Sequence, residues 1–289
     1  MFDYHLHLWP HDQAEAPCSI EQVAAYCEAA AAKGVTQIAL TEHLFRFRQG
    51  LEAVGPFWEG SDPDASMRAS MGGYVDHHCH GDLDDYVELV LTARAQGLDV
   101  LLGLEVDYYP GRMDKVAELL GAYPFDLLLG SVHWLGAWRF DHLEDPLQMD
   151  RWDVISTDAA FDAYAEALEE LASCGAVDVL AHPDLIKVAG RHLDAPEEWW
   201  DRIAEAAAGA GLAAEVSSAG WRKPVNEQYP SLPLLERFVR AGVALTTASD
   251  AHHGAQVGDE ITAAVSLIKS AGGAAVSSFQ SRVRSEVAI

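Results

Sequence analysis

Two histidines stand two residues apart near the start of the chain, in the segment M-F-D-Y-H-L-H-L-W-P-H-D at positions 1–12. Apolar and polar residues alternate there with a period of two, which favours a β-strand. His5 and His7 therefore point to the same side of that strand, and His11 follows in the loop beyond Pro10. Imidazoles placed in this way can bind a divalent metal such as Zn or Fe. A polar edge strand without metal is the alternative that these residues alone leave open.

Other residues of metal-ligand type recur along the chain, each at or just after the end of a short apolar segment. They are His43, Glu105, His133, His182, Asp250 and His252. Together with the three N-terminal histidines, seven of the thirteen histidines follow this pattern. Random placement would scatter them over helices and other loops as well. The joint pattern therefore favours a metal centre over a set of unrelated polar residues.

The apolar segments alternate with helical patterns. We expect seven strands, at the N-terminus and over 35–40, 100–106, 125–129, 177–180, 212–216 and 243–246. Helices are predicted over 20–33, 83–95, 115–120, 159–172, 197–210 and 234–241, with one more after about residue 258 and no further element beyond it. Residues 44–80 contain scattered Gly, Pro and Asp without a period, which predicts an irregular excursion typical of an active-site lid.

Seven short strands that are apolar on both faces and joined by helices indicate a parallel sheet, closed or nearly closed into an α/β barrel. A barrel of this kind forms one domain at this length, and no repeat or linker is visible, so we expect residues 1–289 to be a single domain. Functional residues of barrels gather at the C-terminal ends of the strands. The ligand-type residues all fall at that edge.

Charge and composition limit the partners. A formal net charge of −26 argues against binding to nucleic acid or to an anionic membrane. No apolar run is long enough for a membrane-spanning helix, and no secretory signal is visible. Cys18, Cys27, Cys79 and Cys174 form no CxxC motif, which favours free thiols in a reducing compartment. We therefore expect a cytoplasmic protein that acts on a small molecule.

The sixth predicted strand is followed by hydroxyl and cationic groups, in S-S-A-G-W-R-K at 217–223. Arg222 suits bidentate phosphate binding, and Ser218 and Lys223 accompany it. Lys187, after the fifth strand, is a further candidate for contact with a phosphorylated substrate. Trp134 is another candidate, although it could equally fill the loop after the fourth strand.

The motifs H-L-H at 5–7, T-E-H at 41–43, G-L-E-V-D at 103–107, G-S-V-H at 130–133, A-H-P-D at 181–184 and S-D-A-H at 249–252 resemble the polymerase-and-histidinol-phosphatase (PHP) family. Within that family, G-S-V-H-W-L-G-A-W at 130–138 and S-S-A-G-W-R-K-P at 217–224 are similar to the monofunctional histidinol-phosphatases. The resemblance implies a distorted (β/α)7 barrel with three divalent metal ions, of Zn, Fe or Mn, at the C-terminal ends of the strands.

The resemblance also implies how the ligands are shared. One metal would take His5, His7, Glu105 and Asp250; a second Glu105, His133 and His182; a third His11, His43 and His252. Glu105 would bridge the first two metals. The residues implied in catalysis are Glu105, Asp250, His252 and Arg222. Asp107, Asp184 and Glu42 are candidates for carboxylates that orient the ligating imidazoles.

The implied activity is metal-dependent hydrolysis of L-histidinol phosphate to L-histidinol and phosphate in histidine biosynthesis. A PHP phosphoesterase that acts on nucleotides or short oligonucleotides is the alternative enzyme. A metal-binding regulatory domain without catalysis is an alternative of a different class.

Overall fold

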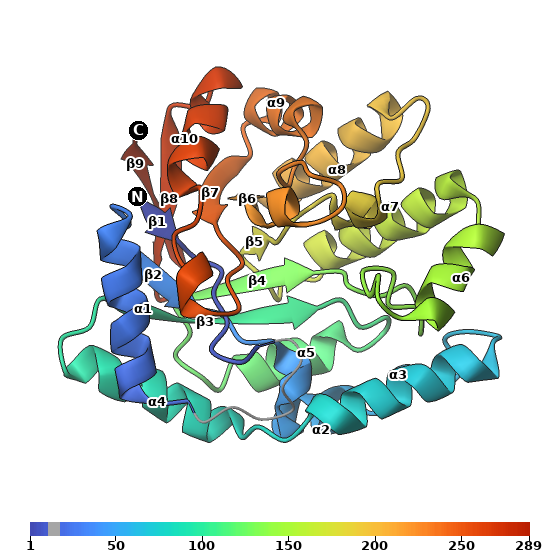
Figure 1. The fold of residues 1–289 in the computed structure, drawn as a ribbon, viewed down its shortest axis with the longest axis horizontal. Helices are drawn as coiled ribbons and strands as arrows, with labels where there is room; N and C mark the ends of the chain where they lie inside the picture. The colour runs from blue at the N-terminus through green and yellow to red at the C-terminus, as the bar shows by residue number, and fades with distance from the viewer. Residues whose placement is uncertain (11–17) are drawn as a thin grey trace.

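The computed structural model describes residues 1–10 and 18–289. Seven strands form one parallel sheet in chain order, each paired with the next. They are β1 (Phe2–Asp3), β2 (Gln37–Leu40), β3 (Val100–Asp107), β4 (Leu127–Ser131), β5 (Val179–Leu180), β6 (Ala213–Ser217) and β7 (Ala244–Ala248). Helices lie around the outside of these strands (Figure 1). The seven predicted strands are therefore confirmed.

The sheet is nearly closed into a barrel, with one unsealed seam between β1 and β7. No continuous ladder joins these two strands. The seam is crossed instead by single hydrogen bonds, from Tyr4 N to Thr247 O at 3.1 Å and from His7 N to Ala251 O at 2.8 Å. This arrangement confirms the expected distorted (β/α)7 barrel.

The helices predicted between the strands are present within a few residues of their expected bounds. They are α1 (Ile20–Ala32), α4 (Leu83–Ala95), α5 (Met113–Leu120), α7 (Thr157–Ser173), α8 (Glu197–Ala210), α9 (Leu232–Ala241) and α10 (Ile261–Ser270). Short 3₁₀ turns lie at η2 (Leu185–Ala189), η3 (Ala219–Arg222) and η4 (Gly254–Gln256). Ser19 caps the start of α1, since its side chain accepts a hydrogen bond from Gln22 N.

The expectation that residues 44–80 are irregular is wrong. This segment contains η1 (Leu44–Arg46), α2 (Arg48–Val54) and α3 (Ala65–His78). Helix α3 buries Met67, Met71 and Val75, which are four residues apart, and Asp64 caps its start. Glycines at 72 and 73 inside the helix hid this period in the sequence. A further helix, α6 (Pro146–Val154), also lies in a stretch expected to be a loop.

The expectation that the chain has no element after α10 is also wrong. Strands β8 (Ala275–Gln280) and β9 (Val283–Ala288) form an antiparallel hairpin. Ser281 and Arg282 occupy the turn with φ of 49° and 63°, a conformation that usually selects Asn-Gly. The turn therefore carries no recognisable sequence signal. Strand β9 is exposed throughout, so apolar and polar residues do not alternate along it. The hairpin packs beside β7, where Thr246 Oγ1 donates to Ser277 O at 3.3 Å, and the Phe279 ring is 6.3 Å from the Tyr4 ring (Figure 1).

Alternation along β3 separates the inside of the barrel from its outside. Leu102, Leu104 and Val106 pack in the outer core with the helices, whereas Leu101 packs in the inner cluster with residues such as Leu127. Because side chains alternate along a strand, Gly103, Glu105 and Asp107 share the inward face with Leu101. The inner face is therefore apolar near the start of the strand and acidic near its C-terminal end.

Asp3 fastens the seam between β1 and β7. Its Oδ1 accepts from Ser249 N at 2.7 Å, and its Oδ2 accepts from Ser249 Oγ at 2.6 Å and from Gly258 N at 2.7 Å. The Asp3 side chain is fully buried. It therefore ties β1 to the segment that follows β7.

Replacing Asp3 with Asn should lower the free energy of unfolding by about 2–3 kcal/mol, because an amide NH₂ group would face donors that now bind a carboxylate. Urea unfolding followed by circular dichroism measures this change. Glu28→Gln removes the same charge from an exposed site on α1 and should leave stability unchanged. Equal midpoints for the Asp3 variant and the wild-type protein would contradict the role given to Asp3.

Candidate metal centre

The ligand-type residues converge at the C-terminal mouth of the barrel. His5 and His7 follow β1, His43 follows β2, and Glu105 lies in β3; the others that follow strands are His133, His182, Asp250 and His252. His5 and His7 lie on the same side as predicted, with ring centroids 5.0 Å apart. His11, the remaining predicted ligand, lies outside the described residues.

Glu105 is the centre of this arrangement. Its Oε2 lies 3.1 Å from His5 Nε2, 3.5 Å from His7 Nε2 and 2.8 Å from His43 Nδ1. Its Oε1 lies 3.0 Å from His182 Nε2 and 3.4 Å from His133 Nε2. One buried carboxylate thus reaches imidazoles from four different strand ends. A carboxylate can do this because each of its two oxygens has two lone pairs.

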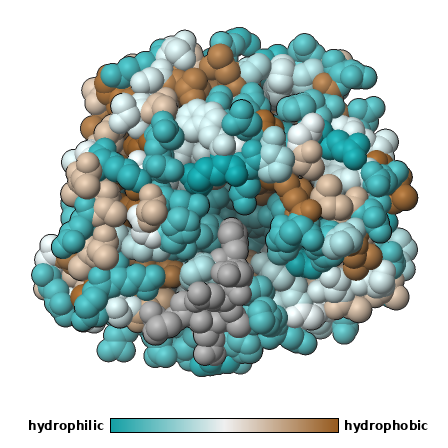
Figure 2. Space-filling model, viewed as in Figure 1, coloured by the Kyte–Doolittle hydropathy of each residue, from teal (hydrophilic) through white to brown (hydrophobic). Residues whose placement is uncertain are grey.

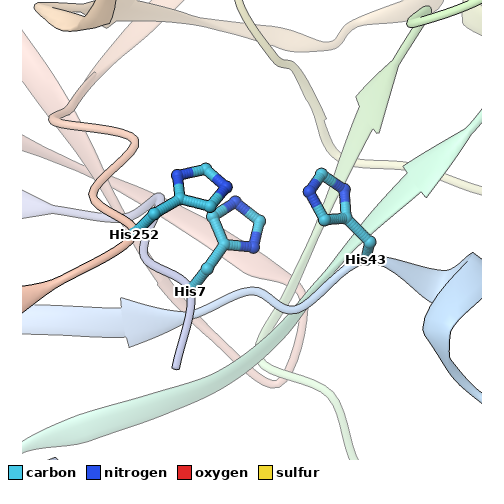
Figure 3. Close-up of side chains that lie close together, drawn as sticks. All are labelled: His7, His43 and His252. Atoms are coloured by element: carbon cyan, nitrogen blue, oxygen red, sulfur yellow. The ribbon is translucent and has the colours of Figure 1, made fainter. Parts of the chain in front are cut away.

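Four groups of side chains place their ligand atoms within 4.8 Å of one another. They are His7, His43 and His252; His5, Glu105 and His182; His5, His7 and Asp250; and His43, Asp107 and His133. Figure 3 shows the first group, with the imidazoles of His7 and His252 side by side and that of His43 facing them. His7 thus lies with His43 and His252 as well as with His5 and Asp250, whereas the family resemblance assigned it only to the second pair.

Two of the candidate carboxylates lie behind the imidazoles of the mouth. Asp107 Oδ1 is within hydrogen-bond distance of His133 Nδ1, at 2.7 Å, and so fixes the orientation of that imidazole. Glu42 Oε2 lies 3.7 Å from His7 Nδ1, which is too far for a hydrogen bond. Asp184 takes no such role, because it accepts from Ser231 N at 2.7 Å and pairs with Lys187 Nζ at 2.9 Å.

Glu215 is a carboxylate that the sequence reasoning missed. Its Oε2 lies 3.0 Å from His5 Nδ1, and its Oε1 accepts from His182 N at 2.7 Å. It stands on the inward face of β6 and is fully buried. The signal in the sequence is a single acid inside the apolar stretch A-A-E-V-S, where a buried charge needs a specific partner.

The carboxylates and imidazoles of the cluster stabilise each other's charged forms. Burial opposes ionisation of Glu105, but His5, His43 and His133 hold the pKa of its carboxyl well below the usual range. Burial also disfavours charge on His133, yet Asp107 and Glu105 raise the pKa of this imidazole to about 10. Acids that attract protons onto imidazoles would attract a divalent cation in their place, since metal binding displaces such protons.

The residues fit a bound metal. His7 Nε2 and Glu105 Oε2 are buried 3.5 Å apart, yet neither makes a hydrogen bond within the described part of the chain. Buried polar atoms left in this state are costly unless a ligand satisfies them. His182 and Asp250 also have positive φ, of 27° and 50°, and such conformations cluster at functional sites. The mixed imidazole and carboxylate set suits Zn, Fe and Mn.

The predicted substrate contacts have different surroundings. Arg222 is beside the cluster: its Nη2 donates to Ser249 O at 2.6 Å and to Asp250 O at 3.1 Å. Ser218 is buried and its Oγ donates to Asp259 O at 2.7 Å. Lys223 is exposed. The hydroxyl of Ser218 is therefore engaged within the protein.

Lys187 and Trp134 are both buried. Lys187 Nζ donates to Gln228 O at 2.8 Å and to Glu227 Oε2 at 2.5 Å, in addition to its pair with Asp184. It therefore joins the loop after β5 to the loop after β6. The Trp134 indole stacks on Phe57, with centroids 5.2 Å apart, and meets the ring of Phe45 edge-on.

In the space-filling view, hydrophilic residues surround a hollow near the middle of the face (Figure 2).

The nearly closed barrel, with buried histidine and carboxylate clusters at one mouth, defines an α/β barrel protein with side chains that could hold metal ions. The model of the PHP domain matches residues 3–219. A probable histidinol-phosphatase of Deinococcus radiodurans is 32% identical over 251 residues, which cover 87% of this chain and 88% of that protein. The chain therefore belongs to the PHP family, in its histidinol-phosphatase branch.

Two solved structures share the fold. The histidinol phosphate phosphatase of Lactococcus lactis, complexed with zinc, L-histidinol and phosphate, has a TM-score of 0.70 at 20% identity and covers 98% of both chains. A putative histidinol phosphatase from Listeria monocytogenes has a TM-score of 0.67 at 17% identity, covering 91% of this chain and 99% of that one. Among the described residues, no helix is long and apolar enough to span a membrane.

Replacing Asp107 with Asn should weaken metal binding or activity by roughly 10- to 100-fold, because the amide no longer fixes the tautomer and orientation of His133. Metal titration followed by elemental analysis measures the loss. Asp114→Asn, on exposed α5 surface, serves as the matched control. Unchanged metal affinity in the Asp107 variant would show that His133 needs no such support.

Proposed function

We propose that this protein is a metal-dependent phosphomonoesterase that hydrolyses L-histidinol phosphate to L-histidinol and phosphate. The observation that carries the proposal is the likeness to the Deinococcus radiodurans histidinol-phosphatase over almost the full length of both chains. The Glu105-centred cluster supports the same reaction class, since it provides the ligand types of a hydrolytic metal centre.

We further propose three divalent ions, of Zn, Fe or Mn, held by His5, His7, His11, His43, Glu105, His133, His182, Asp250 and His252. The zinc bound by the Lactococcus lactis protein supports metal binding by a protein of this fold. When bound, such ions supply Lewis acidity that activates water and neutralises phosphoryl charge. The ion count and identity are to be tested by elemental analysis.

The residues of this chain would position the reaction. Glu105, Asp250 and His252 are proposed as catalytic because each belongs to one of the ligand groups at the mouth of the barrel. Arg222 is proposed to bind the phosphate through the part of its guanidinium that stays accessible, since its side chain is 25% exposed. Buried Glu215 and Asp107 would hold His5, His182 and His133 in place.

The excursion over residues 44–80 is proposed to act as a lid, although it is largely helical. His43 and the aromatic rings of Phe45, Tyr74 and His78 connect this segment to the cluster. A lid built from packed helices would exclude water from the mouth more fully than an irregular loop.

The alternative enzyme, a phosphoesterase acting on nucleotides or short oligonucleotides, is disfavoured by the net charge of −26. A regulatory domain without catalysis is disfavoured by the complete set of ligand-type residues among the described positions. Turnover of different substrates distinguishes these alternatives from the proposed function.

Purified protein should release phosphate from L-histidinol phosphate much faster than from AMP, p-nitrophenyl phosphate or a short RNA. Removal of metal with a chelator, verified by elemental analysis, should abolish this turnover, and adding back Zn, Mn or Fe should restore it. Equal slow rates on all four substrates would refute L-histidinol phosphate as the specific substrate. Full activity of metal-free protein would refute the metal dependence.

Arg222→Ala should mainly raise KM for L-histidinol phosphate, by roughly 10- to 100-fold, because a charged hydrogen bond to phosphate is lost. Steady-state kinetics separates KM from kcat. Arg240→Ala removes an exposed arginine from α9 and should change neither constant. A lower kcat at unchanged KM would mean that Arg222 acts only by holding the backbone of Ser249 and Asp250.

A further inference from the structure

Asp141 lies in the loop between β4 and α6 and contributes to none of the four ligand groups. Its Oδ1 is buried and has no hydrogen-bond partner among residues 1–10 and 18–289. A buried carboxylate oxygen without a partner is costly. Such atoms in a folded protein often mark the place of a ligand.

The backbone around Asp141 is held on both sides. Leu143 N donates to Asp141 O at 3.0 Å, and Trp152 Nε1 donates to Phe140 O at 3.1 Å. The nearby cation, Arg139, forms no ion pair with Asp141 because its guanidinium is directed to other groups. It contacts Ser70 Oγ at 2.9 Å, His142 Nδ1 at 3.0 Å and Asp145 Oδ2 at 3.1 Å.

The loop that carries Asp141 leaves the C-terminal end of β4, so it lies on the side of the barrel where the metal cluster is. The neighbours of Asp141 connect to ligand-type residues through aromatic contacts. The Phe140 ring is 5.6 Å from the Tyr164 ring, whose hydroxyl donates to His182 O at 3.3 Å. The His142 ring is 4.9 Å from the Tyr74 ring, and that ring contacts Phe45, which stacks on His43.

Other buried polar atoms on this side of the barrel are also unsatisfied. The Tyr229 hydroxyl and the Trp134 indole N–H are buried, and neither has a partner in the described part of the chain. The Trp134 ring is 6.2 Å from the His133 ring, and the Tyr229 ring is 6.3 Å from the His182 ring. A phenol and an indole therefore flank the metal cluster on the side of His133 and His182, and the loop that carries Trp134 also carries Asp141.

We infer that Asp141 binds the ammonium group of the substrate and so selects phosphomonoesters that carry a positive charge. This inference rests on the proposed function. The metal cluster and Arg222 can hold only the phosphate end, whereas Asp141 offers the opposite charge to an amine. A carboxylate and an alkylammonium group form a charge-assisted hydrogen bond that a neutral analogue cannot make.

Asp141→Asn tests the inference when it is assayed with two substrates, L-histidinol phosphate and its deamino analogue, 3-(imidazol-4-yl)propyl phosphate. The value of kcat/KM for L-histidinol phosphate should fall roughly 10- to 100-fold, the range for a lost hydrogen bond to a charged group. The value for the deamino analogue should stay at the wild-type level. Glu144→Gln removes the same charge from an exposed position three residues away and should alter neither value.

Equal losses on both substrates, or no loss on either, would overturn the role of Asp141. The wild-type protein gives a second measurement that does not depend on folding of the variant. L-Histidinol should inhibit it more strongly than deamino-histidinol, and equal inhibition would also overturn the inference. If the wild-type protein fails to hydrolyse L-histidinol phosphate at all, the proposed function fails instead.

Discussion

The structure depends on one buried carboxylate shared by imidazoles from separate strands. Glu105 lies between His5, His7 and His43 on one oxygen and His133 and His182 on the other. A buried charge of this kind is tolerated only where opposite charge or hydrogen bonds surround it. Each strand end must therefore arrive at the correct height and angle, and the geometry of the barrel meets this requirement.

The barrel positions the strand ends in two ways: side chains alternate between its inside and its outside along each strand, and further buried carboxylates hold the strands behind the cluster. The inward face of β3 changes from Leu101 to Glu105 within four residues, so apolar packing and polar chemistry occupy different levels of the same interior. Gly103 lies between them, and a Cβ there would come within 2.7 Å of Thr41 Cγ2. Glu215 and Asp3 then fix His5 and the β7 end. Function at the mouth thus depends on packing below it.

The proposed substrate carries opposite charges at its two ends. Metal ions and Arg222 would provide positive charge for phosphate, and Asp141 would provide negative charge for the ammonium group. In a chain with net charge −26, the long-range field by itself would repel a phosphate. Local arrangement of a few groups therefore matters more for recognition than overall charge does.

The sequence by itself determined the strand order, most connecting helices and the ligand-type residues at the strand ends, because burial and a period of two or 3.6 are local properties of the chain. It could not determine the β8–β9 hairpin or α3, whose exposed residues, unusual turn and internal glycines hide that period. Only the tertiary structure decided that Glu215, Asp3 and the Oδ1 of Asp141 are buried, that Lys187 is engaged between two loops, and that His7 lies beside His252. Those contacts join residues far apart in the chain, and a local pattern carries no information about which distant side chain completes a buried charge.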